Sequence, residues 1–231
     1  MSKLQKISCL IFVAILLSAC ATGYQERNGT YVFLHWDAGG GQKASPIRGA
    51  DAKTFQVLNT FYAKDKNHAY FGGWEIRGAD PRSFVALSDW YAKDAANVYG
   101  ENRIIDGADP ATFSLVSTWG RDKNDVYRGW EPIKACDPST FQLIDDSWER
   151  DNKCVYARGK RLENANPITF VVINPFFGKD DKYVFTFLGK VIEGADAATF
   201  RAAKDRCKYC VEDKNHCYGH DGKAYRCRAV K

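Results

Sequence analysis

Short apolar runs separated by polar turns recur along most of this chain. In the runs Phe55–Leu58 (FQVL) and Phe113–Val116 (FSLV), alternate apolar residues can face one side of a sheet. No stretch sustains the apolar period of about 3.6 residues that marks an amphipathic helix. The pattern therefore predicts an all-β protein of short strands without long helices.

The predicted strands belong to a unit that repeats, of which the stretch from Gly49 to Arg77 is the clearest copy. Four of its positions recur with a period of about 29 residues. The aspartate of Gly-Ala-Asp recurs as Asp51, Asp80, Asp109, Asp137 and Asp196, with Asn166 in the fifth place; the following phenylalanine as Phe55, Phe84, Phe113, Phe141, Phe170 and Phe200; the aspartate of the next turn as Asp65, Asp94, Asp122, Asp151, Asp180 and Asp213; and the aromatic residue after it as Tyr70, Tyr99, Tyr127, Tyr156, Phe185 and Tyr218. This register defines a repeat protein.

Each copy contains the ingredients of a β-hairpin. In a turn such as Asp65-Lys66-Asn67, the aspartate can accept hydrogen bonds from its own downstream backbone, and asparagine tolerates left-handed geometry. Two short strands around such a turn form a hairpin. The Ala-Asp-Pro-x-Ser/Thr-Phe segment fits a tight turn or a single helical turn, with aspartate as the cap and proline at the first position.

The copies predict a linear arrangement. A half repeat covers residues 31–48, and full repeats start near residues 49, 78, 107, 135, 164 and 194, so the repeat domain spans 31–231. A propeller blade usually needs about 40 residues, which is longer than this unit. We therefore expect tandem β-hairpin repeats in a solenoid-like or meander stack, with a small propeller-like ring as the alternative.

The N-terminus predicts export and lipid attachment. Lys3 and Lys6 precede the apolar run 7–17, which is too short to span a bilayer. The sequence Leu-Ser-Ala-Cys at 17–20 resembles the bacterial lipoprotein cleavage box, which makes 1–19 a signal peptide and Cys20 the lipidated residue. An ordinary secretory signal is the alternative. Residues 20–30 are read as a tether, and Ala21 favours the outer membrane, facing the periplasm, in a Gram-negative host.

Composition and charge fit a folded envelope protein. The chain has 231 residues, of which 45% are hydrophobic and 14% aromatic, so a packed core is expected. Removal of Lys3 and Lys6 with the signal leaves 31 basic and 28 acidic residues, with no long run of one sign. This mixed surface does not predict a nucleic-acid partner.

Three segments carry a family resemblance: residues 63–70 (AKDKNHAY), 120–127 (GRDKNDVY) and 211–218 (VEDKNHCY). Together with the recurring Gly-Ala-Asp-Pro-x-Thr-Phe element, they resemble the DKNYY family of bacterial exported proteins and lipoproteins over about residues 28–231. The resemblance implies a repeat-containing envelope protein and brings no catalytic residues to transfer. The chain departs from the motif at residues 94–97, 151–153 and 180–182 but keeps an aspartate there, which indicates that the motif forms the turn.

Two repeated features have both a structural and a ligand-binding interpretation. The aspartates and asparagines of the turns could hold Ca²⁺, but each loop offers too few carboxylates, so a turn role is expected. Trp90, Trp119 and Trp148 are taken to share one position, flanked by Phe61 and Phe176. Such a ladder is either the packed core between copies or a platform for stacking glycans.

Six cysteines remain after Cys9 and Cys20 are set aside, and an even number in an exported chain predicts disulfides. Cys136 and Cys154 form the natural pair. The other four, Cys207, Cys210, Cys217 and Cys227, allow three pairings and would brace the terminal copy. With His216 and His220 they could instead hold Zn²⁺, and Cys207 and Cys210 could act as a redox pair.

The sequence contains neither a nucleophile elbow nor a phosphate-cradling loop, and we expect neither catalytic residues nor a cofactor or resident metal. The predicted function is a lipid-anchored envelope protein with a binding or structural role. Besides the membrane, reached through the lipid, its expected partner is an envelope protein or a glycan. The alternative function is a glycan- or peptidoglycan-binding module that uses the aligned aromatic residues.

Overall fold

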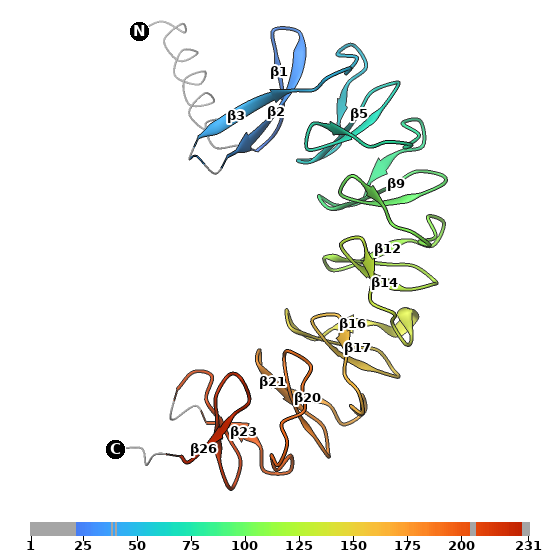
Figure 1. Ribbon diagram of the computed structural model, residues 1–231. Helices are drawn as coiled ribbons and strands as arrows, with labels where there is room; N and C mark the ends of the chain where they lie inside the picture. Colours follow the sequence, from blue (N-terminus) through green and yellow to red (C-terminus); the bar gives the residue numbers. More distant parts are fainter. Residues whose placement is uncertain (1–21, 38, 40, 204–206, 228–231) are drawn as a thin grey trace, which may run out of the picture. The chain divides into compact units, whose positions relative to one another are not determined.

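The computed structural model describes residues 22–37, 39, 41–203 and 207–227. The predicted signal peptide and Cys20 lie outside these residues. The chain divides into two compact halves, residues 1–106 and 107–231. Figure 1 shows small sheets that follow one another in chain order within each half.

The N-terminal half contains three antiparallel sheets. The first is formed by β1 (Gly23–Arg27), β2 (Thr30–Trp36) and β3 (Gln42–Pro46); the second by β4 (Gln56–Val57), β5 (Tyr62–Lys64), β6 (Ala69–Phe71) and β7 (Trp74–Glu75); the third by β8 (Val85–Ala86), β9 (Tyr91–Lys93), β10 (Val98–Gly100) and β11 (Arg103–Ile104). In every sheet, strands adjacent in sequence are neighbours in space.

The C-terminal half continues the pattern with four sheets. These are β12 (Ser114–Val116), β13 (Trp119–Arg121), β14 (Val126–Arg128) and β15 (Glu131–Pro132); β16 (Gln142–Leu143), β17 (Trp148–Arg150), β18 (Val155–Ala157) and β19 (Lys160–Arg161); β20 (Val171–Asn174), β21 (Phe177–Lys179) and β22 (Val184–Thr186); and β23 (Arg201–Ala202), β24 (Val211–Glu212), β25 (Cys217–Tyr218) and β26 (Ala224–Tyr225). One 3-10 turn is found among the described residues, η1 (Pro138–Thr140), and it has proline in its first turn, as the Asp-Pro-x-Thr sequence predicted.

The all-β repeat fold is therefore confirmed, with one refinement. Each full copy is a meander of up to four short strands, because the chain on either side of the predicted hairpin also pairs with it. Neighbouring sheets stay separate and do not join into a closed barrel in the part of the chain that is described. No helix among the described residues has the length and apolarity needed to cross a membrane.

The N-terminal partial copy is longer than the sequence predicted. Residues 20–30 were expected to be a tether, but Gly23–Arg27 forms β1 and pairs along its whole length with β2. Strand β1 offers one aromatic residue among polar ones, which hid its pattern. That residue, Tyr24, packs at 5.1 Å from the ring of Phe33 and 5.6 Å from that of Phe55. The half repeat assigned to 31–48 thus includes an additional strand.

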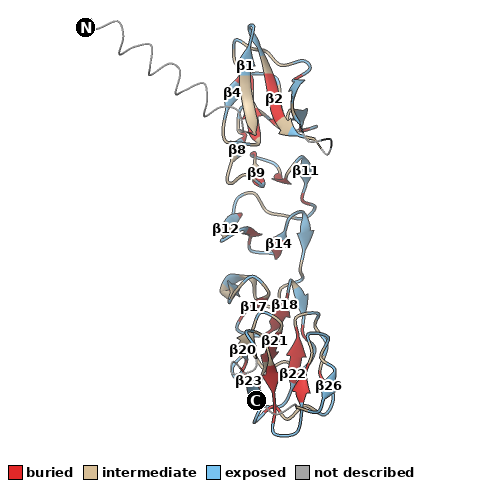
Figure 2. Cartoon of the chain, turned by 90° about the vertical axis from the view of Figure 1, so that its left-hand side faces the viewer, coloured by how far each residue is buried: buried red, intermediate tan, exposed pale blue. Residues whose placement is uncertain are grey.

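The core lies largely between consecutive copies. Tyr62 of one copy clusters with Phe84 and Tyr99 of the next, and all three side chains are buried. Figure 2 shows that strands β21 and β22 are buried, while β26, at the edge of its sheet, is exposed. Because each copy buries its apolar face on its neighbour, a single copy would lack most of its core.

Candidate functional site

The aspartate of the predicted turn, here called the turn aspartate, is the centre of each copy's hydrogen-bond network. In the first full copy, Asp65 Oδ1 accepts from the backbone N–H groups of Asn67 and His68 at 2.7 and 2.8 Å. Asp65 Oδ2 accepts from the backbone N–H of Asp51 and the hydroxyl of Tyr70, both at 2.8 Å. One carboxylate therefore joins the turn, the preceding loop and the following strand.

The same four bonds recur at Asp94, Asp122, Asp151 and Asp213. At Asp180 the hydroxyl bond is absent because Phe185 replaces the tyrosine, and the three backbone bonds remain. All six side chains are no more than 7% exposed. The repeated Asp…Tyr spacing thus places a tyrosine hydroxyl where it can donate to the buried turn aspartate of the same copy.

The charge of the turn aspartates is stabilised by these bonds. Burial acts to raise the pKa of Asp213, but the hydrogen bonds from Asp196, Tyr218, Asn215 and His216 outweigh it and lower that pKa to about 2. The pKa of Asp65 and that of Asp94 are lowered in the same way. Since N–H and O–H donors already occupy both oxygens, the turn interpretation accounts for these residues without Ca²⁺.

The predicted row of three tryptophans does not exist. Trp119 and Trp148 lie three residues before their turn aspartates and are buried, whereas Trp90 lies four residues before Asp94 and is 49% exposed. A shift of one residue in a strand moves a side chain to the opposite face. Trp119 and Trp148 therefore belong to the core, which corrects the platform interpretation for these two residues.

A different set of aromatic residues shares the position of Trp90. Phe61 stacks on Trp90 with ring centroids 5.4 Å apart. In the C-terminal half, Phe176 meets Tyr209 edge-on, also at 5.4 Å. Thr118 and Ser147 stand at this position in the intervening copies. Aromatic residues at this position therefore contact one another in two separate pairs, one in each half of the chain.

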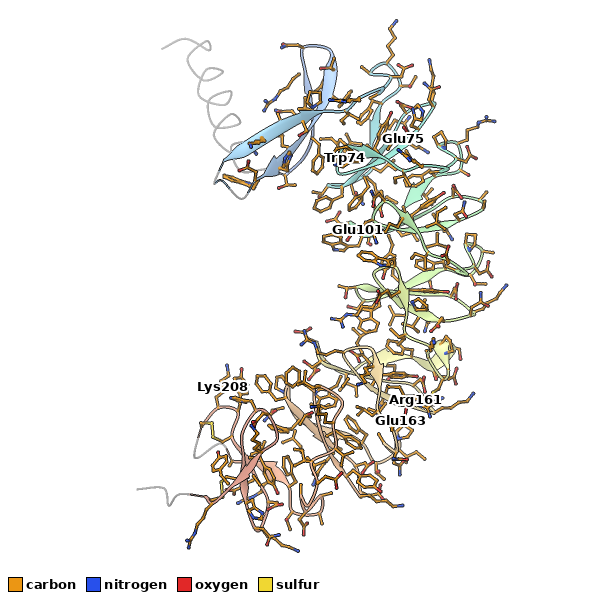
Figure 3. All side chains as sticks on the ribbon, viewed as in Figure 1. Trp74, Glu75, Glu101, Arg161, Glu163 and Lys208 are labelled. Atoms are coloured by element: carbon orange, nitrogen blue, oxygen red, sulfur yellow. A yellow bond between two sulfur atoms is a disulfide. The ribbon has the colours of Figure 1, made fainter. Side chains whose placement is uncertain are left out.

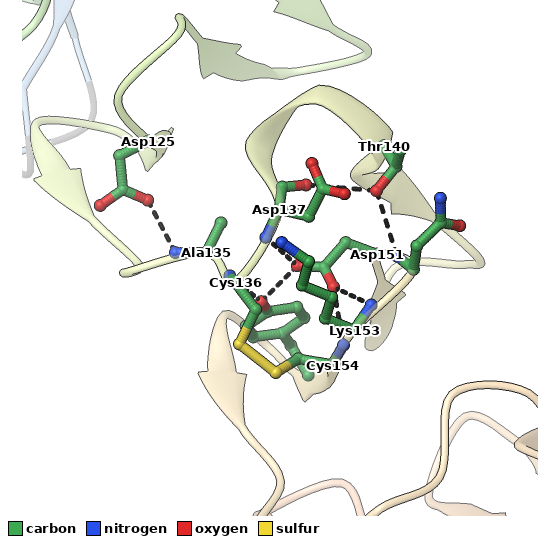
Figure 4. Close-up of a disulfide and its surroundings, with 10 residues drawn as sticks. Asp125, Ala135, Cys136, Asp137, Thr140, Asp151, Lys153 and Cys154 are labelled. Carbon is green, nitrogen blue, oxygen red and sulfur yellow. Dashed lines mark hydrogen bonds between the residues drawn. A yellow bond between two sulfur atoms is a disulfide. The ribbon is translucent and has the colours of Figure 1, made fainter.

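The six cysteines in the described part of the chain form three disulfides. Cys136 bonds to Cys154, as the sequence predicted. Figure 4 shows this bond beside the network of Asp151, whose oxygens accept from the backbone N–H groups of Asp137 and Cys154. The bond therefore reinforces the fourth copy where its loop meets its turn.

The terminal copy contains the other two bonds, Cys207–Cys210 and Cys217–Cys227, which select one of the three pairings left open. Glu212, Cys217 and Cys227 bring potential ligand atoms within 4.8 Å of one another. Both of those sulfurs are held in a disulfide, as are the sulfurs of Cys207 and Cys210, so the thiolates that a zinc site requires are not present.

A groove lies between the partial copy and the first full copy, and we call it the aromatic groove. Its volume is about 560 Å³. It is lined by Phe33, His35, Ser45, Pro46, Arg48, Gly72, Gly73, Trp74 and Glu75. Trp74 and Glu75, both labelled in Figure 3, form one edge, and the Trp74 side chain is 75% exposed.

Two glycines shape this groove. Gly72 and Gly73 form the tight turn between β6 and β7, with φ of +57° and +84°. A Cβ on Gly73 would lie 2.9 Å from Cβ of Phe33, so the turn backbone contacts the partial copy directly. The backbone N–H of Gly73 donates to the hydroxyl of Tyr24 at 3.2 Å. This close approach fixes Trp74 at the groove edge.

Sequence reasoning missed the groove because its walls come from two copies. Phe33 and His35 belong to β2, and Trp74 follows about 40 positions later. The available signal was the Gly-Gly pair before an exposed tryptophan, since two adjacent glycines are typical of a tight hairpin turn.

The fold and the repeated network define the class of this protein as a tandem β-meander repeat protein. A DKNYY family model matches residues 3–103 and 91–222, and the chain belongs to this family. No curated protein matches the chain. No solved structure matches it.

Proposed function

We propose that this protein is a lipid-anchored, extracytoplasmic binding protein without catalytic activity, and that the aromatic groove binds an uncharged glycan. The observation that carries the proposal is the Trp74 ring, which is 75% exposed at the edge of a groove with polar groups around it. Exposed apolar surface rimmed by polar residues marks interaction sites.

The chemistry of the groove fits a sugar chain. The C–H face of a pyranose can stack on the indole of Trp74, and Phe33 and Pro46 extend the apolar surface. Ser45, Arg48 and Glu75 supply donors and acceptors for the hydroxyl groups. Because one arginine is balanced by one glutamate, the groove favours an uncharged ligand over a polyanion.

Anchoring is proposed from the sequence of residues 1–20, and it has its own test. Metabolic labelling with a radiolabelled fatty acid should label the wild-type protein and fail to label a Cys20→Ala variant. The variant should also leave the membrane fraction. Retention of Cys20→Ala in that fraction at the wild-type level would overturn the lipid anchor.

The binding proposal is tested with purified protein and soluble β-1,4-linked N-acetylglucosamine oligomers, by isothermal titration calorimetry. We expect Trp74→Ala to weaken binding at least about tenfold, since truncating an aromatic anchor of a binding site costs on the order of 2 kcal/mol. Trp130→Ala is the control, because it removes another exposed tryptophan that does not line the aromatic groove. Equal affinities of wild type and Trp74→Ala, or no binding of these and other neutral oligosaccharides, would refute a glycan site in this groove.

A further inference from the structure

A second groove, here called the basic groove, occurs in the C-terminal half at the equivalent place in the repeat. It lies between β15 of one copy and the β18–β19 turn of the next, and its volume is about 400 Å³. Five cationic side chains line it, with Glu131 as the single acid: Arg128, Lys134, Arg158, Lys160 and Arg161.

Arg128 is held in this groove by contacts that involve no carboxylate. The Arg128 guanidinium donates to the carbonyl oxygen of Arg158 at 2.8 Å, and it lies 5.5 Å from the ring centroid of Trp119. Among the described residues, none of the five cations forms an ion pair with a carboxylate. Arg161 is labelled in Figure 3. Such a cluster attracts an anion without first having to break internal pairs.

A buried carboxylate lies behind this groove. Glu149 on β17 is 1% exposed, and its Oε2 accepts from the backbone N–H of Gly159 at 3.0 Å. Its Oε1 has no hydrogen-bond partner among the described residues. Four other copies place alanine or glycine at this position: Ala63, Ala92, Gly120 and Gly178. The core of the repeat therefore does not require a glutamate here.

We propose that the basic groove binds an anionic glycan, a sugar chain carrying carboxylate or phosphate groups, and that ionisation of Glu149 weakens this binding. The groove is open and lined by five cations from two copies, which suits a chain with several anionic groups better than one buried ion. Gly159 is both a groove residue and the donor to Glu149, so the charge of Glu149 lies next to the bound anion.

The groups around Glu149 determine how it titrates. Burial raises its pKa, Arg128 and Arg158 lower it, and Asp145 raises it; the result is about 7. Below this pH the side chain is neutral and the groove keeps its full positive charge. Above it, one negative charge is added beside Gly159. At the separations expected inside a protein, one such charge changes anion affinity on the order of fivefold.

The experiment uses the mature chain and three probes: oligogalacturonate for carboxylate, a phosphorylated mannan oligosaccharide for phosphate, and neutral N-acetylglucosamine oligomers. We expect tight binding of at least one anionic probe, and the stronger of the two identifies the anionic group. Arg158→Ser/Arg161→Ser should weaken it at least about tenfold and reduce its salt dependence. Arg82→Ser is the control, because it removes an exposed cation that does not line the basic groove.

Glu149→Gln tests the second part of the proposal. With oligogalacturonate, whose carboxylates stay ionised over this range, the wild type should bind about fivefold more tightly at pH 6 than at pH 8, and the variant should bind equally at both. Wild-type affinity in the double arginine variant, or a preference for a short DNA duplex over both glycans, would overturn the proposal. A pH effect that persists in Glu149→Gln would remove Glu149 from it.

This proposal stands apart from the one made for Trp74. Loss of neutral-sugar binding in Trp74→Ala concerns the aromatic groove only. Loss of anionic-sugar binding in the double arginine variant concerns the basic groove only. The experiments can therefore refute the proposal for one groove and support the proposal for the other.

Discussion

The two grooves occupy the same place in the repeat but have opposite chemistry. In both, a tight turn of one copy lies against the last strand of the copy before it, and the second residue of the turn is a glycine with positive φ, Gly73 or Gly159. Around Gly73 the groove is aromatic and nearly neutral, whereas around Gly159 it is strongly basic. The comparison shows that the same turn glycine can stand beside lining residues of very different chemistry, so the lining can change while the turn stays the same.

The backbone of the two turns is satisfied in different ways. The N–H of Gly73 donates to the Tyr24 hydroxyl, and the N–H of Gly159 donates to the Glu149 carboxylate. Burial raises the pKa of Tyr24, so that acceptor stays neutral at physiological pH. The pKa of Glu149 is also raised, to about 7, so that acceptor changes its charge near neutrality. Only in the basic groove, therefore, does the group that accepts a hydrogen bond from the turn glycine change its charge near neutral pH.

The largest effect is expected from breaking the network that both grooves share. Asp65→Ala and Asp151→Ala should each destabilise their half of the chain by about 4 kcal/mol, because four donors lose a buried carboxylate. Urea unfolding followed by tryptophan fluorescence measures this loss. Asp180→Ala is the comparison, and it should cost about 1 kcal/mol less, because Phe185 offers no hydroxyl to lose. Equal losses at Asp151 and Asp180 would contradict the role given to the tyrosine.

A disulfide distinguishes the two regions. Cys136 and Cys154 close a loop with a sequence separation of 18 in the copy that forms one wall of the basic groove. Replacing both by serine should cost about 3 kcal/mol of stability in the C-terminal half. Neutral-sugar binding at the aromatic groove should stay unchanged, as calorimetry would show. A parallel loss of that binding would mean that the two halves are coupled.

The pH dependence of stability should also differ between the regions. Because the pKa of Glu149 is raised from 4.5 to about 7, the folded state holds its proton more tightly than the unfolded state between these values. The unfolding free energy should therefore fall by about 2 kcal/mol from pH 5 to pH 7 on account of this group. Glu149→Gln should remove that fall when both proteins are unfolded in urea at each pH. An unchanged slope in the variant would show that Glu149 titrates normally.

The smallest effect concerns the close approach at the aromatic groove. Gly73→Ala and Gly107→Ala both place a side chain at positive φ, +84° and +78°. Only at Gly73 does the new Cβ meet another atom, Cβ of Phe33 at 2.9 Å. We expect Gly73→Ala to cost about 1 kcal/mol more than Gly107→Ala in thermal unfolding. If the two variants melt together, the partial copy moves aside at little cost.

The sequence predicted what is local and missed what lies between copies. The hydrogen bonds of Asp65 within its own turn follow from its residue type, and they were expected. Asp65 also bonds to Asp51 and Tyr70, and all three residues stand at recurring positions. The repeat pattern therefore identified these residues but did not show that they are hydrogen-bonded to one another. Pairing of β1 was hidden because polar residues surround Tyr24.

The tryptophans show a second limit. Counting from the turn aspartate separates Trp90 from Trp119 and Trp148 by one residue, and in a strand one residue decides between core and surface. The grooves could not be predicted at all from the repeat, because they depend on residues that the copies do not share and on walls from two copies. Arg158 and Trp74 became candidate binding residues only when neighbouring copies were seen together.

The reach of the turn aspartate has a consequence for how the chain folds. Asp65 accepts from a backbone N–H only 14 positions earlier and from a hydroxyl five positions later. Proteins whose contacts are close in sequence fold quickly, since little loop entropy is lost before each contact forms. The network of each copy can therefore form as soon as its own residues and those of a neighbouring copy are available, because the two bury their apolar faces on each other. A chain that emerges from a membrane one segment at a time would acquire its structure in the same order.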